Sequence, residues 1–192
     1  KSYFCEYMDN KNSILLIDPT FDPAFAKDCK LLVKIGLKSF SYAIINAETK
    51  KVNAVFDEQE CDDVAKRLAD LLKNDDYLGI NFIEIKLGIY SENNISIPNE
   101  LYQGDDLTFF TPHRSENIYA NTHSNFELTS VFSFSKKIDE IIAQSLTTSK
   151  KYLSTTTLLK LAENCADNAL MLDFTAGSVY VVYIKEKTFS VK

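Results

Sequence analysis

Two stretches of this chain repeat one another at a fixed distance, and this repeat most limits the fold. LLVKIGLKSFSYAII begins at Leu31, and LMLDFTAGSVYVVYI begins at Leu170, which is 170 − 31 = 139 residues later. Ser39 and Ser178 keep the same spacing of 139 residues. In each stretch a period-two apolar pattern changes phase at a short turn, as in a β-hairpin. A spacing of this size corresponds to one small domain, so the sequence predicts a duplicated fold whose halves each contain such a hairpin.

Periodic apolar residues in the rest of the chain predict a mixture of strands and helices. Further strands are predicted at residues 52–56, 83–89, 107–110, 117–120, 128–134 and 188–191. Helices are predicted at residues 61–74, 138–146 and 158–165. Asp57 and Glu60 are predicted to cap the first of these helices, and Pro98 to begin a short helix of its own. Residues 1–30 are predicted to be irregular.

Composition indicates an ordinary globular protein and disfavours several classes of partner. Of 192 residues, 45% are hydrophobic, and only five glycines and four prolines are present, which argues against long linkers. The net charge of −6 disfavours binding to nucleic acid or to an anionic membrane. No apolar run reaches the length of a membrane span, so we expect no membrane insertion.

The four cysteines, Cys5, Cys29, Cys61 and Cys165, are spaced too irregularly to indicate a metal site. They form no C-x-x-C pair, and only two histidines are present, so a zinc site is not expected. Free and mostly buried thiols in a reducing cytoplasm are the preferred interpretation, although spacing alone leaves a disulfide open.

Three segments of the chain resemble a known family. They are IDPTFDPAFAKDCKLLVKIGLKSFSYAII, ISIPNELYQ and LSTTTLLKLAENCADNALMLDFTAGSVYVVYIKEKTFSV. In these segments the chain resembles the uncharacterised Bacteroidetes family called domain of unknown function 3822. More broadly, the order strand–turn–strand, strand, helix, strand, repeated once, is similar to the ground plan of the actin-like ATPases. The resemblance implies an α/β, ribonuclease H-like duplicated fold with mixed sheets.

The repeat also predicts how the chain divides. We expect a first actin-like subdomain at residues 1–104 and a second at residues 105–192, with its hairpin at residues 170–184. If the second half mirrors the first, a helix and further strands should follow residue 191. The second half is therefore expected to be incomplete, or to be a reduced copy of the first.

The resemblance also directs attention to the two hairpin turns, which bind phosphate in actin-like ATPases. There, each first strand carries an Asp that organises Mg²⁺, and small residues follow whose N–H groups reach the phosphate. The first turn here offers only Lys34 or Gly36 in place of the Asp. The second turn, DFTAGS, resembles D-x-G-G-G-T and keeps Asp173, Gly177 and Ser178, which form a candidate phosphate turn. A plain hairpin, in which the glycine supplies a positive φ and the serine bonds the turn, explains the same three residues and is preferred.

The two histidines offer a second candidate chemistry. His113 and His123 lie in a polar stretch, and Ser124 is adjacent to His123, but no G-x-S-x-G motif surrounds them. We interpret them as solvated loop histidines. An unrelated α+β hydrolase that uses this stretch remains an alternative.

The altered first turn favours a non-catalytic function. We expect a protein-binding or assembly component with a degenerate actin-like fold, a protein partner and a cytoplasmic location. This interpretation includes no catalytic residue, metal or cofactor. The alternative within the same superfamily is an ATPase or kinase that binds Mg-ATP through Asp173 and a further acid.

Overall fold

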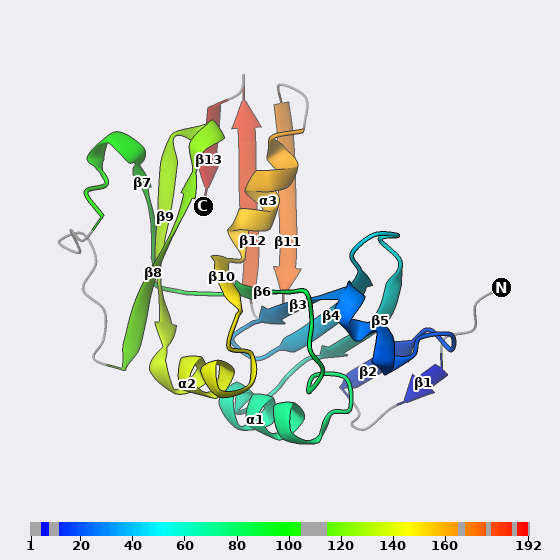
Figure 1. Ribbon diagram of the computed structural model, residues 1–192. Helices are drawn as coiled ribbons and strands as arrows, with labels where there is room; N and C mark the ends of the chain where they lie inside the picture. Colours follow the sequence, from blue (N-terminus) through cyan, green and yellow to red (C-terminus); the bar gives the residue numbers. More distant parts are fainter. Residues whose placement is uncertain are drawn as a thin grey trace.

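The computed structural model describes residues 5–7, 12–104, 115–164, 168–175, 178–185 and 188–191, which form three β-sheets and three α-helices. The largest sheet has seven strands (Figure 1). In spatial order they are β1 (Cys5–Tyr7), β2 (Ser13–Ile17), β5 (Val52–Glu58), β4 (Phe40–Asn46), β3 (Cys29–Ile35), β6 (Glu84–Ile89) and β10 (Lys150–Leu153). The β3–β6 and β6–β10 pairs are parallel and the others are antiparallel, so the sheet is mixed as predicted.

The main core lies between this sheet and two helices, α1 (Val64–Asn74) and α2 (Lys136–Ser145) (Figure 1). Strand β3 alternates between buried and half-buried residues, because successive side chains point to opposite faces. Its buried face joins Leu68 of α1 and Ile142 of α2 in one apolar cluster. Burying a side chain of this size contributes about 1.5–3 kcal/mol, so the cluster fixes both helices against the sheet.

Helix α1 ends at Asn74 as predicted, but it begins later than the predicted capping box. Asp57 lies inside β5, where it pairs with Ile14 of β2 and Ser41 of β4. The N-cap is Asp63, whose carboxylate accepts a hydrogen bond of 2.9 Å from the backbone N–H of Lys66. The prediction was wrong because pairing on both sides of β5 holds the chain extended through residue 58.

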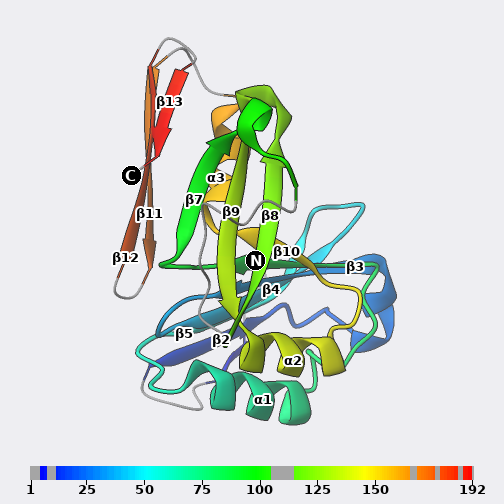
Figure 2. The ribbon, with the colours of Figure 1, turned by 90° about the vertical axis from the view of Figure 1, so that its left-hand side faces the viewer.

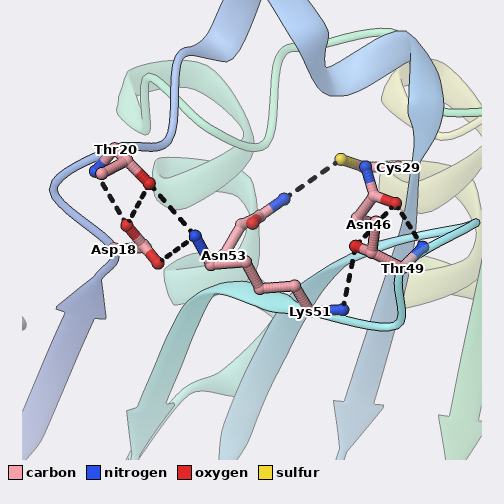
Figure 3. A network of polar contacts seen from close by, with 7 residues as sticks. All are labelled: Asp18, Thr20, Cys29, Asn46, Thr49, Lys51 and Asn53. Atoms are coloured by element: carbon pink, nitrogen blue, oxygen red, sulfur yellow. Dashed lines mark hydrogen bonds and ion pairs between the residues drawn. The ribbon is translucent and has the colours of Figure 1, made fainter. Parts of the chain in front are cut away.

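The N-terminal segment is more ordered than predicted. It contains β2 and a 3₁₀ helix, η1 (Pro23–Asp28), in addition to the short β1. Between these elements the buried carboxylate of Asp18 pairs with Lys51 at 2.7 Å and accepts two bonds from Thr20 (Figure 3). This network ties the segment to the β4–β5 connection, so contacts distant in sequence order residues that have no periodic pattern.

A second sheet stands beside the first and contains β7 (Asn94–Pro98), β9 (Leu128–Ser135) and β8 (Glu116–His123), all antiparallel. Two short 3₁₀ helices, η2 (Asn99–Leu101) and η4 (Ser124–Phe126), follow β7 and β8. The predicted short helix thus begins one residue after Pro98, which is its N-cap. The predicted strands at 117–120 and 128–134 are confirmed, whereas the one at 107–110 lies outside the described residues.

Two strands pair with strands from the other side of the predicted subdomain boundary at residue 104. Strand β7 precedes it but pairs with β9 of the later part, and β10 follows it but pairs with β6 of the earlier part. Strand β10 was not predicted, because its four residues carry too short a pattern to be recognised. These exchanged strands join the two parts of the chain.

The third sheet contains the second hairpin and confirms the repeat. Its strands are β11 (Asn168–Thr175), β12 (Ser178–Lys185) and β13 (Thr188–Val191), and α3 (Thr155–Ala162) packs on one face. The pairs of β3–β4 run from Cys29 with Asn46 to Ile35 with Phe40. Each recurs 139 residues later in β11–β12, from Asn168 with Lys185 to Phe174 with Val179. The two hairpins therefore have the same register.

Candidate functional site

The two hairpins meet at a pair of side chains that occupy equivalent positions in the repeat. Lys34 lies near the end of β3, on the face turned away from the α1–α2 core. Asp173 lies 173 − 34 = 139 residues later, near the end of β11. The Lys34 Nζ donates to both carboxylate oxygens of Asp173, at 2.9 Å to Oδ1 and 3.0 Å to Oδ2. The side chains are 35% and 25% exposed, so the ion pair borders on solvent.

This pairing determines what the site can do chemically. A divalent cation between the hairpins would need carboxylate or other oxygen ligands from both sides. Here one side supplies an ammonium group, which carries a positive charge and has no lone pair to give. A cation that approached Asp173 would have to displace Lys34 from both oxygens. Among the residues that the structure describes, no group of three His, Cys, Asp or Glu side chains is arranged to hold a metal ion.

A pair of tyrosines supports the contact between the two parts of the chain. Tyr180 of β12 lies opposite Asp173, and its ring packs on Tyr90 with the centroids 5.1 Å apart. Its hydroxyl donates to the Ser91 carbonyl oxygen at 3.4 Å. Burial, assisted by the nearby carboxylate, raises the pKa of Tyr180 to about 12, so the hydroxyl stays protonated. Tyr180 therefore attaches the second hairpin to the segment that follows β6.

The first turn uses its own backbone donor internally. The N–H of Gly36 donates to the Ser39 carbonyl oxygen at 2.8 Å and is not available to a phosphate group. A Cβ atom at Gly36 would lie 2.2 Å from the Ser39 Oγ, so this glycine is required by the packing of a buried serine. The glycine of the first turn has a structural explanation that involves no ligand.

The second turn is described only in part. Thr175 and Ser178 form its closing pair, which leaves two residues between them. Gly177 and the side chain of Ser178 lie outside the described part of the structure, so their assignment to a phosphate turn stays a prediction. Of the three candidate residues, the structure gives the surroundings of Asp173 alone, and places it against Lys34.

One of the two histidines differs from its predicted setting. His123 is not a solvated loop residue: it ends β8, is 3% exposed, and its Nε2 lies 3.2 Å from the Oγ of Ser130. Burial lowers its pKa below the ordinary value. The prediction was wrong because β8 extends to residue 123 and pairs this residue with Leu128 of β9. His113 lies outside the described residues.

This buried pair does not support the hydrolase alternative. Ser130 is 1% exposed, so a substrate would reach neither its hydroxyl nor the His123 imidazole in this structure. The serine adjacent in sequence, Ser124, lies in η4. The histidine and its serine are explained as a buried polar pair that satisfies its own hydrogen bonds.

The Lys34–Asp173 pair was not predicted, although the sequence carries one signal for it. The two residues are equivalent in the repeat, and a lysine facing an aspartate at equivalent positions is an opposite-charge match. Only the docking of the hairpins shows that these positions touch.

Within the described residues, no helix is both long and apolar enough to cross a membrane.

The arrangement of the elements is similar to that of a solved protein from Bacteroides thetaiotaomicron, described as having an actin-like ATPase fold and unknown function. That match has a TM-score of 0.80 and 13% identity, and covers 90% of this chain and 72% of that chain. It confirms the predicted actin-like fold.

Two weaker structural matches add nothing to the fold assignment. Two Aquifex aeolicus structures, a PPX-GPPA enzyme and a type II variant of a Ppx/GppA phosphatase, give TM-scores of 0.36 and 0.39 at 9% identity. Each match covers 85% of this chain and 51% of the other, and is too weak to support an argument.

No curated protein is significantly similar in sequence. The profile of the family described as protein of unknown function (DUF3822) matches residues 18–190, and the chain belongs to that family.

Proposed function

We propose that this chain is a non-catalytic member of the actin-like fold that acts as a protein-binding or assembly component. The observation that carries the proposal is the ion pair of Lys34 with Asp173. Phosphoryl transfer by such a fold depends on Mg²⁺ held near the phosphates and on charge stabilisation there. The Lys34 ammonium neutralises the only acidic group that the sequence analysis assigned to this site.

The first turn supports the same proposal independently. Its Gly36 N–H is bonded within the turn, and its Leu37 and Lys38 are bulky where close approach to a phosphate needs small residues. Both hairpins would have to bind the phosphates together, so the loss of one turn removes half of a nucleotide clamp. Neither the ATPase nor the kinase alternative gains support from the described residues.

An edge strand supports the protein-binding part of the proposal. Within the described residues β7 lies at the edge of its sheet, and Ile95 in it is 38% exposed. Leu101 of the following η2 is 56% exposed. An exposed edge with apolar side chains is suited to adding a strand from a partner protein.

We also propose a cytoplasmic location, since Cys29 and Cys61 are free, buried thiols whose pKa values are raised by burial.

Thermal unfolding in the presence of Mg-ATP tests the non-catalytic part. A ligand that binds only the native state raises the melting temperature, and at 100 times its Kd it adds about 2.7 kcal/mol of stability. We expect no shift at 5 mM Mg-ATP, and no hydrolysis of ATP. A rise of several degrees, absent with Mg²⁺ alone, would show that the site binds nucleotide and would overturn the proposal.

Two matched variants test the part that concerns the protein partner. Ile95→Asp places a charge on the edge strand, whereas Ile83→Asp places one on another exposed isoleucine outside it. Both should fold, because both side chains are accessible to solvent. After cross-linking in the native cell extract, we expect a partner that the wild type and Ile83→Asp retain and that Ile95→Asp loses. Equal retention by all three chains would exclude β7 as the contact.

A further inference from the structure

A cavity of about 320 Å³ lies between helix α1 and the strands β2 and β5. Its apolar wall is formed by Leu15 of β2, Phe56 of β5 and Leu71 of α1. Phe56 and Leu71 are buried, and Leu15 is half-buried beside them. A cavity of this size, with apolar walls and a few polar groups, is typical of a site for one small molecule.

The cavity lies on the α1 side of the large sheet, away from the ion pair of Lys34 with Asp173. Leu15 and Phe56 are directly opposite one another in register and both pack in the cluster that contains α1, whereas Lys34 is on the other face of the sheet. Figure 2 shows α1 and α2 along one face of this sheet and the hairpin of β11 and β12 beyond the other. A ligand in the cavity would therefore be remote from the hairpin turns.

The polar part of the wall comes from one side of α1. Arg67, Asp70 and Asn74 line the cavity at positions i, i+3 and i+7 of the helix, together with Leu71 at i+4. Residues three or four apart on a helix are neighbours, with their Cβ atoms about 5–6 Å apart. Arg67 and Asp70 thus present a cation and an anion next to one another.

The guanidinium group of Arg67 is only partly satisfied by the protein. Its Nε donates to the Oε2 of Glu58 at 2.8 Å, and the Glu58 side chain is 7% exposed. The Nη2 of Arg67 is buried and has no hydrogen-bond partner among the described residues. A buried donor without a partner costs free energy, and arginine cannot escape this cost by losing its proton. An acceptor oxygen bound against Arg67 would supply what the protein leaves out.

Asp70 offers the opposite charge to a ligand. It is exposed, and its carboxylate has no hydrogen bond or ion pair with other residues in the part of the chain that the structure describes. The other acid of the wall, Asp75, is already engaged. Its Oδ2 accepts from the Tyr42 hydroxyl at 2.9 Å, and its Oδ1 accepts from the N–H groups of Tyr77 and Leu78. Asp70 is therefore the carboxylate that a cationic group can reach.

We propose that this cavity binds a free α-amino acid with an aliphatic side chain. The ligand carboxylate accepts hydrogen bonds from Arg67, and the ammonium group on the same carbon donates to Asp70. The ligand side chain packs on the apolar wall. Two opposite charges on one carbon match a cation and an anion that are neighbours on one helix. The proposal goes beyond the proposed function, because the site uses neither the hairpin turns nor β7.

Titration followed by the NMR signals of the backbone amides tests the chemistry of the ligand. We expect L-leucine to shift the signals of residues 67–75 in a saturable way and to leave those of α3 in place. N-acetyl-L-leucine lacks the ammonium group and L-leucinamide lacks the carboxylate, so each should bind at least tenfold more weakly.

Two results of this titration would overturn the proposal. One is the absence of a saturable shift up to about 10 mM L-leucine, which would leave water as the occupant of the cavity. The other is equal affinity for the three compounds, because the apolar side chain alone would then account for binding.

Variants at three exposed positions of α1 test the location of the site. Asp70→Asn removes the charge that holds the ammonium group and should weaken binding of L-leucine at least fivefold. Asn74→Trp places a large side chain in the wall of the cavity and should abolish binding. Lys73→Trp is the matched control, because Lys73 is exposed next to Asn74 but lies outside the wall, and it should bind as the wild type does.

Circular dichroism would check that each variant is folded before its affinity is compared. Wild-type affinity in both Asp70→Asn and Asn74→Trp would refute the assignment to this cavity. An equal loss of binding in Lys73→Trp and Asn74→Trp would refute it as well, since the effect would then follow from any tryptophan on the helix.

Discussion

Lys34 and Asp173 occupy the same position in two copies of one hairpin, and their side chains meet at 2.9 Å. The ion pair therefore joins equivalent positions of the two hairpins, and each copy of the repeat supplies one of its side chains. The repeat alone would supply two like residues, so the opposite charges of this pair reflect divergence between the halves at the point where they meet.

The ion pair of Lys34 with Asp173 should contribute modestly to the free energy of unfolding, and this contribution should depend on salt concentration. Both side chains are partly exposed, and such pairs contribute up to about 1 kcal/mol. We expect Lys34→Ala to lower the free energy of unfolding by about this amount in urea titrations at low ionic strength. The charge-exchanged double variant Lys34→Asp with Asp173→Lys should recover most of the loss. Equal losses in 0.02 M and 1 M NaCl would contradict an electrostatic origin.

The turn glycine should be essential only while its serine neighbour is present. In Gly36→Ala the new Cβ would lie 2.2 Å from the Ser39 Oγ, which forces a local rearrangement. We expect a loss of about 1–3 kcal/mol in thermal or urea unfolding, as for other overpacked sites. Gly79→Ala is the control, because nothing lies within 4 Å of a Cβ there. Adding Ser39→Ala to Gly36→Ala should recover part of the stability, and no recovery would refute this cause.

The Asp18 network should make folding sensitive to acid at an unusually low pH. Hydrogen bonding to Lys51 and Thr20 lowers the pKa of Asp18 to about 2 (Figure 3). The unfolded carboxyl has a pKa of about 3.9, so its stabilising effect is complete above that pH and is lost as pH falls toward 2. In Lys51→Met the acid unfolding midpoint, followed by circular dichroism, should rise. Lys66→Met, at an exposed helix position, should leave the midpoint unchanged.

Acidification should also lower the stability of the fold through His123, at a higher pH than through Asp18. Burial lowers its pKa in the folded protein, so the unfolded chain binds the proton more readily. Stability should therefore fall as pH drops below about 6.5, the ordinary pKa of histidine. We expect the urea midpoint of His123→Gln to change less between pH 7.5 and 5.0 than that of the wild type. His113→Gln should keep the wild-type dependence, and a flattened profile there would contradict the assignment to His123.

Local pattern was sufficient for most of the fold. The strands of the two hairpins and β6 alternate strongly, and α1 has a clear helical period. The existence of all these elements was predicted. The missed β10 is four residues long, and the N-terminal network depends on Lys51 and Thr20, which lie in different segments. Such contacts leave no periodic trace, because they depend on where segments meet rather than on how each one repeats.

The sequence by itself determined the duplication, since the 139-residue spacing is present in the letters and the register follows from alternation. It also singled out Asp173 and the altered first turn. Only the tertiary structure decided that Lys34 pairs with Asp173, that His123 is buried, and that one face of β11 and β12 is exposed while its counterpart lies under α1. The reason is physical: alternation assigns side chains to the two faces of a strand, but the docking of whole elements decides what each face touches.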